Sequence, residues 1–463
     1  MTEVQLPAAF IRQMQALLGM EDAQQFLNSF LAPRAYGLRF NPLKTESVPA
    51  SAAALEQPFH LTPVPWCNTG YYYDEEARPG KHPYHSAGLY YIQEPSAMSA
   101  AELLDAQPGE TILDFAAAPG GKTTHIAGCM QGQGLLIANE IHPARAKILS
   151  ENVERIGIRN AVATNCAPHE LSAKFIAFFD RIMLDAPCSG EGMFRKDADA
   201  VGEWSEEHVH YCAQRQADIL EHAAIMLKPG GKLVYSTCTF NREENETTIE
   251  QFVASHPEFS VERTERIWPH LALGEGHFVA VLFKSNEPSN GSFAESTDRD
   301  KSKRRDRDKK GSRASSLQAE MELFHSFAKQ SLPGFNLQAG EALRFGDALY
   351  WLPHDREGRF SAASLDGIKV ARAGLHLGDI RKNRLEPAHA LAMAVKADTA
   401  AWVQSYSADS PEIAAYLRGE TLPAEPRLSG WGLVAVDGYP LGWAKASGGQ
   451  LKNHLPKGLR RFS

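Results

Sequence analysis

The sequence predicts an α/β protein built around a parallel, doubly wound sheet. From about residue 85 to residue 285, segments typical of strands alternate with segments typical of helices. Two cysteines, Cys188 and Cys238, come at or just after the ends of two predicted strands. Ligands on such sheets bind beyond the carboxyl ends of the strands. We therefore expect both cysteines to lie on the binding side of the sheet.

The individual elements follow from runs of apolar residues and from the residues that end them. Apolar residues at helical spacing occupy 143–157, and a long helix is predicted between Glu206 and Leu227. Pro229, Gly230 and Gly231 end that helix, because proline and glycine disfavour helix continuation. The predicted strands cover residues 111–115, 135–140, 161–165, 180–185, 232–238 and 277–283.

The chain has 463 residues, which is more than one hydrophobic core usually organises. Residues 286–316 contain almost no aliphatic side chains, which predicts a flexible linker. Nine Lys or Arg face three Asp between Arg299 and Arg313, so weak attraction to phosphates is an alternative role. The predicted parts are an N-terminal region at 1–100, a core domain at 101–285, the linker at 286–316 and a C-terminal region at 317–463.

The C-terminal region contains short strand-like runs that glycines interrupt, which predicts a small β-rich module. It ends in basic residues, which suit RNA but are also common in exposed tails. These basic residues are Lys445, Lys452, Lys457, Arg460 and Arg461.

Composition narrows the class of protein. The 43% hydrophobic and 22% charged residues are ordinary for a globular protein, and no apolar run approaches the ~20 residues of a membrane span. No signal peptide is apparent at the N-terminus, and the six cysteines show neither CxxC nor Cys/His spacing. We therefore expect a cytoplasmic protein without membrane contact, disulfides or a metal site. The net charge of −8 does not by itself indicate a nucleic-acid binder, although local patches remain open.

A turn of small residues after the first predicted core strand is the candidate cofactor loop. Small residues let a ligand approach the backbone, and the N–H groups at a helix start attract carboxylates or phosphates. The loop nearly matches a phosphate-binding loop, but Ala116 stands where that motif requires glycine, which weakens an NTPase hypothesis. The loop residues are Ala116, Ala117, Ala118, Pro119, Gly120, Gly121 and Lys122.

Glu140 ends the next strand, where an acid can accept both hydroxyls of a ribose; capping the following helix is an equally good alternative. Ribose recognition together with a short anionic group at the first turn fits S-adenosylmethionine. Arg145, just beyond Glu140, is a further candidate cofactor residue, and Asp185 is expected to line the same crevice.

The motifs DFAAAPGGKT, NE-IHPAR, DAPCSGEG and STCTFNREENE occur here in this order. With them, residues 35–285 resemble the RNA cytosine-C5 methyltransferases of the NOL1/NOP2/Sun family. The short N-terminal region and the additional C-terminal half resemble the bacterial RsmF type, which modifies 16S ribosomal RNA. The resemblance implies a Rossmann-like S-adenosylmethionine-dependent core, a small N-terminal α/β region and a C-terminal PUA-like RNA-binding module. It also implies that Cys238 is the nucleophile, that Cys188 assists product release and that Asp185 contacts the base.

The chain departs from the family's pattern after the third strand, where an acid often lies near the adenine. Asn165, Cys166 and Ala167 stand there instead, so Asn165 or backbone amides would have to replace the carboxylate. Arg39 and Asn41 are expected either to hold RNA or to close the N-terminal region over the core. Arg195 and Lys196 are either phosphate contacts or surface charges.

The chemistry explains why two thiols are useful. A thiolate that attacks C6 of cytosine turns C5 into a nucleophile able to accept a methyl group. A neutral Asp185 would donate a hydrogen bond to N3, and Cys188 would serve as base or relay when the C5 proton leaves. Lys122 either orients the base or caps the loop. The alternatives are a tRNA methyltransferase, a P-loop-like NTPase that uses Lys122 and Thr123, and a ribosome-assembly factor without catalysis.

Overall fold

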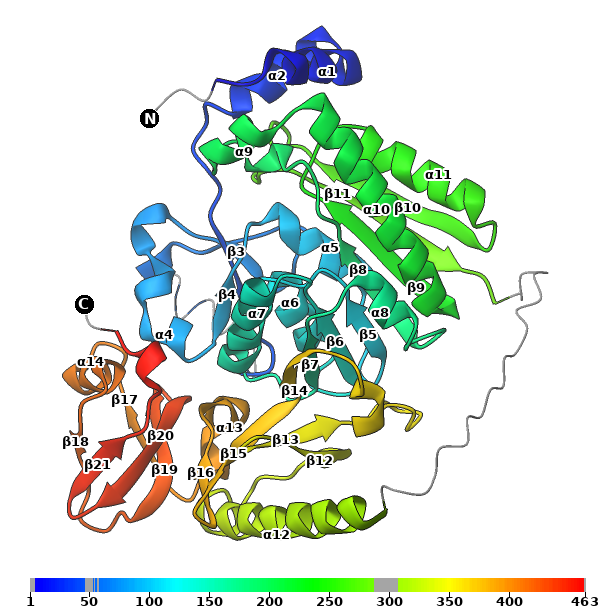
Figure 1. The fold of residues 1–463 in the computed structure, drawn as a ribbon. Helices are drawn as coiled ribbons and strands as arrows, with labels where there is room; N and C mark the ends of the chain where they lie inside the picture. The colour runs from blue at the N-terminus through cyan, green and yellow to red at the C-terminus, as the bar shows by residue number, and fades with distance from the viewer. Residues whose placement is uncertain (1–4, 46–52, 54, 56–57, 287–306, 462–463) are drawn as a thin grey trace.

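The computed structural model describes residues 5–45, 53, 55, 58–286 and 307–461, and Figure 1 shows how they are arranged. Four sheets follow one another along the chain. The largest has the strand order β10-β11-β9-β8-β5-β6-β7-β14 and forms the centre of the molecule. None of the helices in the described residues combines the length and the apolar character needed to cross a membrane.

The central sheet is mixed, whereas the sequence predicted a parallel one. The strands β5 to β9 run parallel to one another, but β10, β11 and β14 pair antiparallel. β10 was missed, because most of its side chains are exposed and polar and no apolar run reveals it. The strands are β5 (Thr111–Asp114), β6 (Leu135–Asn139), β7 (Ala161–Thr164), β8 (Phe179–Asp185), β9 (Leu227–Thr237), β10 (Phe259–Ile267), β11 (His277–Lys284) and β14 (Val370–Ala373).

Helices cover both faces of this sheet, as the buried strands require. Alternate residues of one strand enter two different cores: Ile112 packs with the helices on one face and Leu113 with those on the other. The first group is α5 (Ser99–Leu104), α6 (Gly121–Cys129) and α7 (Pro143–Ile156). The second group is α8 (Pro168–Ser172), α10 (Glu206–Met226) and α11 (Thr248–Ser255).

The order of the strands fixes the place of the site. β5 pairs with β6 on one side and with β8 on the other, so the chain reverses its direction of winding at β5. The crevice expected from the sequence therefore belongs at the carboxyl ends of β5 and β8, which is where such sheets bind ligands. Pro229 and its two glycines lie within β9, because the strand already begins at Leu227, where α10 has ended.

The N-terminal region has two parts. The helices α1 and α2 lie at one end of the molecule, beside α9 (Figure 1). There Phe10 and Phe26 pack against Phe194, Trp204 and Phe240 of the core. The other part is a small sheet, and the elements are α1 (Ala8–Leu18), α2 (Met20–Ser29), β1 (Gly37–Phe40), β2 (Thr62–Pro63), β3 (Gly70–Tyr72), α4 (Pro83–Ser86), β4 (Tyr90–Ile92) and α9 (Ala198–Glu203).

The C-terminal region begins earlier than the sequence predicted. The helix α12 (Arg307–Ser331) starts inside the stretch 286–316 that was predicted to be a linker, and residues 287–306 of that stretch lie outside the described residues. The region is also joined to the core, because β14 adds a strand to the edge of the central sheet beside β7. Its own first sheet contains β12 (Gly340–Phe345), β13 (Ala348–Pro353), β15 (Leu375–Arg381) and β16 (Arg384–Pro387).

The last sheet is the small β-rich module that the sequence predicted. It has five strands in the order β17-β19-β20-β21-β18, with Trp443 fully buried on β20. Its strands are β17 (Val403–Tyr406), β18 (Leu422–Pro423), β19 (Gly430–Val436), β20 (Tyr439–Ser447) and β21 (Gln450–Asn453), and its neighbouring helices are α13 (His389–Ala394) and α14 (Pro411–Arg418).

Candidate active site

The loop after β5 carries the predicted cofactor residues Ala116 to Lys122 at the crevice. Its backbone is fixed by the N–H of Ala117, which donates to the carbonyl of Asn139 (2.8 Å) at the end of β6. Gly120 has φ 113°, a conformation that residues with a side chain rarely adopt, and α6 begins directly after it. Thr123 donates to Asp114 Oδ2 (2.5 Å), and burial raises the pKa of Asp114 to about 7.

Glu140 lies at the end of β6 with only 2% of its surface exposed. One carboxylate oxygen accepts the backbone N–H of His142 (2.9 Å), which precedes the first residue of α7, so Glu140 holds the turn before the helix and caps no N–H of the helix itself. The other oxygen lies 3.5 Å from Arg145 Nη1. Arg145 also donates to the carbonyl of Ala118 (2.7 Å). Glu140, Arg145 and the small-residue loop are therefore neighbours, as the sequence predicted.

Asn165 supports the loop after β6. Its side-chain amide donates to the carbonyls of Glu140 (2.7 Å) and Ile141 (2.9 Å). These donors are occupied, so only the carbonyl oxygen of its side chain remains for the role of the missing acid. The backbone N–H of Asn165 donates to Lys369 in the C-terminal region (2.8 Å), a contact that the sequence gave no sign of.

Asp185 lies at the end of β8, where the sequence placed it. Lys122 Nζ is 2.8 Å from one of its oxygens, and the hydroxyl of Ser236 donates to the other (2.8 Å). Burial raises the pKa of Asp185, but the charge of Lys122 and the two hydrogen bonds outweigh it and bring the pKa below its usual value. The neutral Asp185 that the predicted donor role requires is therefore not favoured in the free protein, because the charge of Lys122 stabilises the carboxylate.

The thiols of Cys188 and Cys238 lie 3.4 Å apart, although fifty positions separate them in the chain. β8 and β9 are adjacent and parallel, so their carboxyl ends deliver both residues to one place. The hydrogen bond to Cys238 and burial together raise the pKa of Cys188 well above its ordinary value. A protonated Cys188 can donate a hydrogen bond through its S–H to the Cys238 sulfur, and this hydrogen bond stabilises negative charge on that sulfur.

Two buried glutamates that the sequence did not single out hold the cysteine loops together. Glu244 accepts from the backbone of Ser189 (2.9 Å), from Gln216 (2.8 Å) and from Asn241 (2.7 Å). Glu191 accepts from the backbones of Phe240 (2.6 Å) and Asn241 (2.9 Å). The sequence did carry a signal for them, because Glu191 and Glu244 stand inside the two cysteine motifs without an evident partner for their charge.

A third missed residue is His277, at the start of β11. It is buried, its Nε2 lies 3.9 Å from Asp185 Oδ1, and neither ring nitrogen has a hydrogen-bond partner within the described ranges. Burial and Lys122 lower its pKa to about 4. A neutral imidazole with free ring nitrogens therefore borders the crevice.

Arg39 and Asn41 close the N-terminal region onto the core. Arg39 is buried and donates to Gln93 (3.1 Å), to Thr124 (2.8 Å) and to the carbonyl of Gly121 (3.3 Å). Asn41 donates to the carbonyls of Gly88 and Ile156, both at 2.9 Å. Of the two alternatives, the structure supports closure of the N-terminal region, because these side chains are occupied by protein atoms.

Arg195 is neither a phosphate contact nor a surface charge, so both predicted alternatives are wrong. It is buried beside Glu275 (2.7 Å) and donates to the carbonyls of Ser29 (2.8 Å) and Gly274 (3.0 Å). Its guanidinium therefore joins α2 to the core. Lys196 is half-buried.

One cluster of metal-ligating side chain types exists that sequence spacing did not reveal. Cys67, Glu102 and His125 have ligand atoms within 4.8 Å of one another. His125 Nε2 lies 3.1 Å from Glu102, and burial together with the cation Arg39 lowers the pKa of His125 to about 4. Because Arg39 and Lys122 already place positive charge beside His125, we interpret the cluster as a hydrogen-bonded contact between the N-terminal region and the core.

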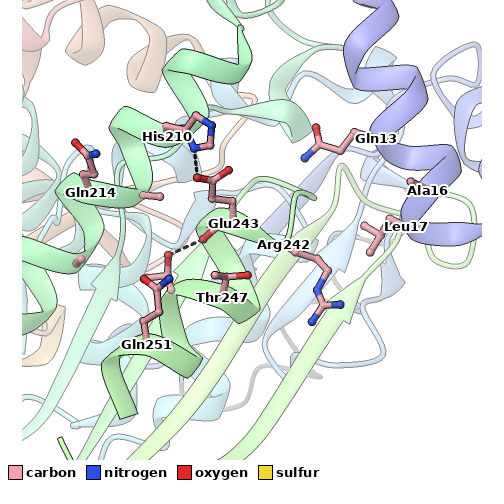
Figure 2. Close-up of a pocket in the computed structure, with 12 residues that line it drawn as sticks. Gln13, Ala16, Leu17, His210, Gln214, Arg242, Glu243, Thr247 and Gln251 are labelled. Atoms are coloured by element: carbon pink, nitrogen blue, oxygen red, sulfur yellow. Dashed lines mark hydrogen bonds and ion pairs between the residues drawn. The ribbon is translucent and has the colours of Figure 1, made fainter. Parts of the chain in front are cut away.

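A hollow of about 970 Å³ lies apart from the two cysteines. It is bordered by α1, α10 and the segment Glu243–Thr247, and Figure 2 shows Gln13, His210, Arg242 and Glu243 around it. His210 and Glu243 form an ion pair across its wall. None of the predicted site residues lines this hollow.

A small-residue loop and a buried acid at the switch point of an α/β sheet define the class of a methyltransferase core. Comparisons with known proteins agree with this class. The model of "16S rRNA methyltransferase RsmB/F" matches residues 101–294, and the model of the N-terminal domain of 16S rRNA methyltransferase RsmF matches 6–95. The models of the RsmF first C-terminal domain and of the RsmF PUA domain match 326–395 and 403–461.

Individual relatives cover almost the whole chain. Ribosomal RNA small subunit methyltransferase F of Shewanella loihica is 33% identical over 94% of this chain and 91% of its own length. The protein of that name from Klebsiella pneumoniae is 31% identical over 99% of this chain and 97% of its own length. The chain belongs to the RsmB/F family of 16S rRNA methyltransferases.

Solved structures support the fold. A methyltransferase homologue from Pyrococcus horikoshii has a TM-score of 0.55 and 28% identity, and the match covers 61% of this chain and 96% of that one. NSun6 from Pyrococcus horikoshii, solved with SFG, also has a TM-score of 0.55, at 21% identity over 61% of this chain and 99% of that one. The Rossmann-like core and the C-terminal PUA domain that the resemblance implied are thereby confirmed, and the P-loop NTPase hypothesis finds no support.

Proposed function

We propose that this protein transfers a methyl group from S-adenosylmethionine to C5 of a cytosine in 16S ribosomal RNA, through a covalent bond between Cys238 Sγ and C6. The observation that carries the proposal is the 3.4 Å contact between Cys238 and a Cys188 thiol that holds its proton. The names of the relatives support 16S rRNA as the substrate.

The residues at the ends of β5 and β6 fit the proposed cofactor. Glu140 is buried, and its second oxygen is 3.5 Å from Arg145, which leaves it able to accept from ribose hydroxyls. The small residues of the loop admit a ligand against the backbone at the start of α6, where N–H groups attract a carboxylate. S-adenosylmethionine supplies the electrophilic methyl group of the reaction.

The proposed steps use the side chains of Cys238 and Cys188. The thiolate of Cys238 attacks C6, and the electron pair of the C5–C6 double bond then forms the new bond from C5 to the methyl carbon, whose bond to the sulfonium sulfur breaks with its electron pair left on that sulfur. The C5 proton leaves through Cys188, which accepts it as its own proton passes to solvent. The Cys238–C6 bond then breaks, and its electrons return to sulfur while the double bond re-forms.

An ionised Asp185 recognises cytosine in a way that differs from the donor role expected from the sequence. A carboxylate accepts the N4 amino group of cytosine, as acids do in nucleic-acid recognition, and would repel the O4 of uracil. Lys122, 2.8 Å from Asp185, keeps positive charge beside the ring where negative charge accumulates during the attack.

The test is methyl transfer by variants of the two cysteines. Cys238→Ala should lose transfer to 16S rRNA, and Cys188→Ala should accumulate an RNA–protein adduct that resists denaturation. Full activity of Cys238→Ala would overturn the mechanism. Bisulfite sequencing of rRNA from cells with and without the protein tests the substrate, and unchanged 16S cytosines would favour tRNA or another RNA.

A further inference from the structure

A second hollow, of about 750 Å³, lies where all parts of the chain meet. Its walls come from residues 42–45 of the N-terminal region, 156–159 of the core, 393–398 of the C-terminal region and 437–440 of the last sheet. Gln131 and Gly157 of this wall follow the C-terminal ends of α6 and α7. Both helices start at the carboxyl ends of the strands, so the hollow lies at the opposite edge of the central sheet, towards the amino ends of the parallel strands.

Lys44 and Arg159 bring positive charge to this hollow. Lys44 lines it, and its Nζ is shielded from solvent and has no hydrogen-bond partner among the described residues. Arg159 lines it as well, and the charges of Arg155 on α7 and of Arg159 both lower the pKa of Lys44. No ion pair in the described part of the chain joins a carboxylate to Lys44, Arg155 or Arg159.

The two arginines are held in place by other atoms. Arg155 donates to the carbonyls of His85 (3.1 Å) and Tyr90 (3.2 Å). Arg159 donates to the carbonyl of Ala394 through Nε (2.6 Å) and Nη2, and its guanidinium lies 5.0 Å from the ring centre of Phe335. Carbonyls orient these guanidinium groups but do not neutralise them.

The acids at the hollow do not neutralise the cluster either. The Asp437 carboxylate accepts the hydroxyl of Tyr84 (2.9 Å) and the N–H of Ala408 (3.1 Å). Asp398 is exposed at the rim, where Lys396 is exposed as well. The interior of the hollow therefore carries a net positive charge.

A buried, unpaired ammonium is costly, because burial removes its hydration and nothing replaces it. Burial together with Arg155 and Arg159 lowers the pKa of Lys44 to about 7. Because none of these three cations has an ion-pair partner among the described residues, an external anion would compensate their charge. The flexible tail of Lys44 lets its ammonium reach such an anion by rotamer changes alone.

We propose that this hollow is a phosphate-binding site in which Lys44 and Arg159 hold a phosphoryl group between the four parts of the chain. A phosphate suits it because Arg forms directional bonds to phosphate oxygens and Lys supplies a point charge. Bound there, the anion fixes the PUA domain and the N-terminal region relative to the core. The phosphate comes either from an RNA backbone or from a small phosphorylated molecule.

The first test uses sulfate as a probe, because it resembles phosphate in shape and does not titrate near neutral pH. Thermal unfolding of the full chain is measured at fixed pH and fixed ionic strength while low concentrations of sulfate replace chloride. The wild type should gain a saturable increase in Tm, as a ligand that binds only the folded state produces. Absence of a saturable increase in the wild type would overturn the proposal.

Variants assign the effect to Lys44. Lys44→Met should raise Tm in chloride, because it removes an unpaired buried charge, and should lose the increase in sulfate. Lys44→Arg should keep that increase. Lys147, which pairs with Glu151 on the exposed face of α7, is the matched control, and Lys147→Met should respond to sulfate like the wild type. A Lys44→Met protein that is destabilised in chloride, or that keeps the sulfate increase, would contradict the assignment.

The second test separates the two sources of phosphate. If an RNA backbone fills the site, Lys44→Met should lower the dependence of log Kd for a 16S rRNA fragment on log salt by about 0.7 to 0.9, the contribution of one phosphate contact. If a small molecule fills it, the RNA affinity should stay unchanged although the sulfate effect is lost. Because the sulfate experiment involves no methyl transfer, its failure is distinguishable from failure of the proposed reaction.

Discussion

The sulfur atoms of Cys188 and Cys238 lie 3.4 Å apart, in contact but not bonded, at the ends of two adjacent parallel strands. A disulfide needs its sulfurs at about 2.05 Å, so only a small approach separates the two thiols from a covalent bond. An oxidant can therefore join the two cysteines of the proposed catalytic pair in a disulfide bond.

We predict that diamide links Cys188 to Cys238 and stops methyl transfer, because the bond occupies the proposed nucleophile. Activity should return when a thiol reductant is added. Peptide mass spectrometry under non-reducing conditions would detect the cross-link, and Cys188→Ser is the control that cannot form it. Loss of activity without this cross-linked peptide would show that oxidation acts elsewhere.

A second prediction concerns Glu244, whose carboxylate accepts from Ser189, Gln216 and Asn241. In Glu244→Gln an amide N–H₂ replaces one acceptor oxygen and meets donors that it cannot satisfy. A buried group left unsatisfied costs about 1–3 kcal/mol, and the loop that carries Cys188 should loosen with it. We expect a lower urea midpoint together with a lower kcat.

The neighbouring Glu243 provides the matched control for this variant. It pairs with His210 at the hollow in Figure 2 and is partly exposed. Glu243→Gln should therefore change stability and methyl transfer little, since exposed ion pairs contribute about 0–1 kcal/mol. Equal losses in both variants would contradict a specific role of Glu244 in holding the cysteine loops.

The third prediction is a pH dependence of stability that arises from Asp114. Burial raises its pKa to about 7, whereas an unfolded aspartate titrates at about 3.9. Between these two pH values the folded protein binds more protons at Asp114 than the unfolded chain does. The contribution of Asp114 to the free energy of unfolding is therefore fully present below about pH 4 and is lost as the pH rises to 7.

The experiment compares Tm of the wild type and of Asp114→Asn from pH 5 to pH 8. The asparagine cannot ionise, so its Tm should fall less over this range. The difference in unfolding free energy should be on the order of 2–3 kcal/mol, since each pKa unit corresponds to about 1.4 kcal/mol. Parallel curves for the two proteins would show that Asp114 is already ionised at pH 5.

The parts of the structure that the sequence predicted are those that local pattern determines. β5, β6, β7 and β8 are buried on both faces and read as short apolar runs. Motifs that follow such strands come together because the carboxyl ends of parallel strands share an edge. Lys122, Asp185, Cys188 and Cys238 could be placed in one crevice for that reason.

The missed features depend on partners distant in the chain or on charge that only the fold reveals. Glu275, which buries Arg195, is eighty positions away, and β14 joins β7 across more than two hundred. The ionised state of Asp185 follows from a contact with Lys122, whose side chain no motif places. Local sequence alone could not predict these contacts and charge states, because burial and pairing are properties of the assembled sheet.

The last prediction concerns Arg39 on β1. Its guanidinium donates to Gln93, which follows β4, and to Gly121 and Thr124 at the start of α6. Arg39→Met removes the three donated bonds and leaves buried acceptors without partners, which should cost about 2–4 kcal/mol. We expect faster hydrogen exchange at residues 37–40 and 121–124 and a lower Tm, with RNA affinity unchanged under conditions where the variant is folded. If instead RNA affinity fell while Tm and exchange stayed as in the wild type, Arg39 would be an RNA contact and not the residue that closes the N-terminal region. Arg34, an exposed arginine just before β1, is the control, and Arg34→Met should leave exchange in both segments unchanged.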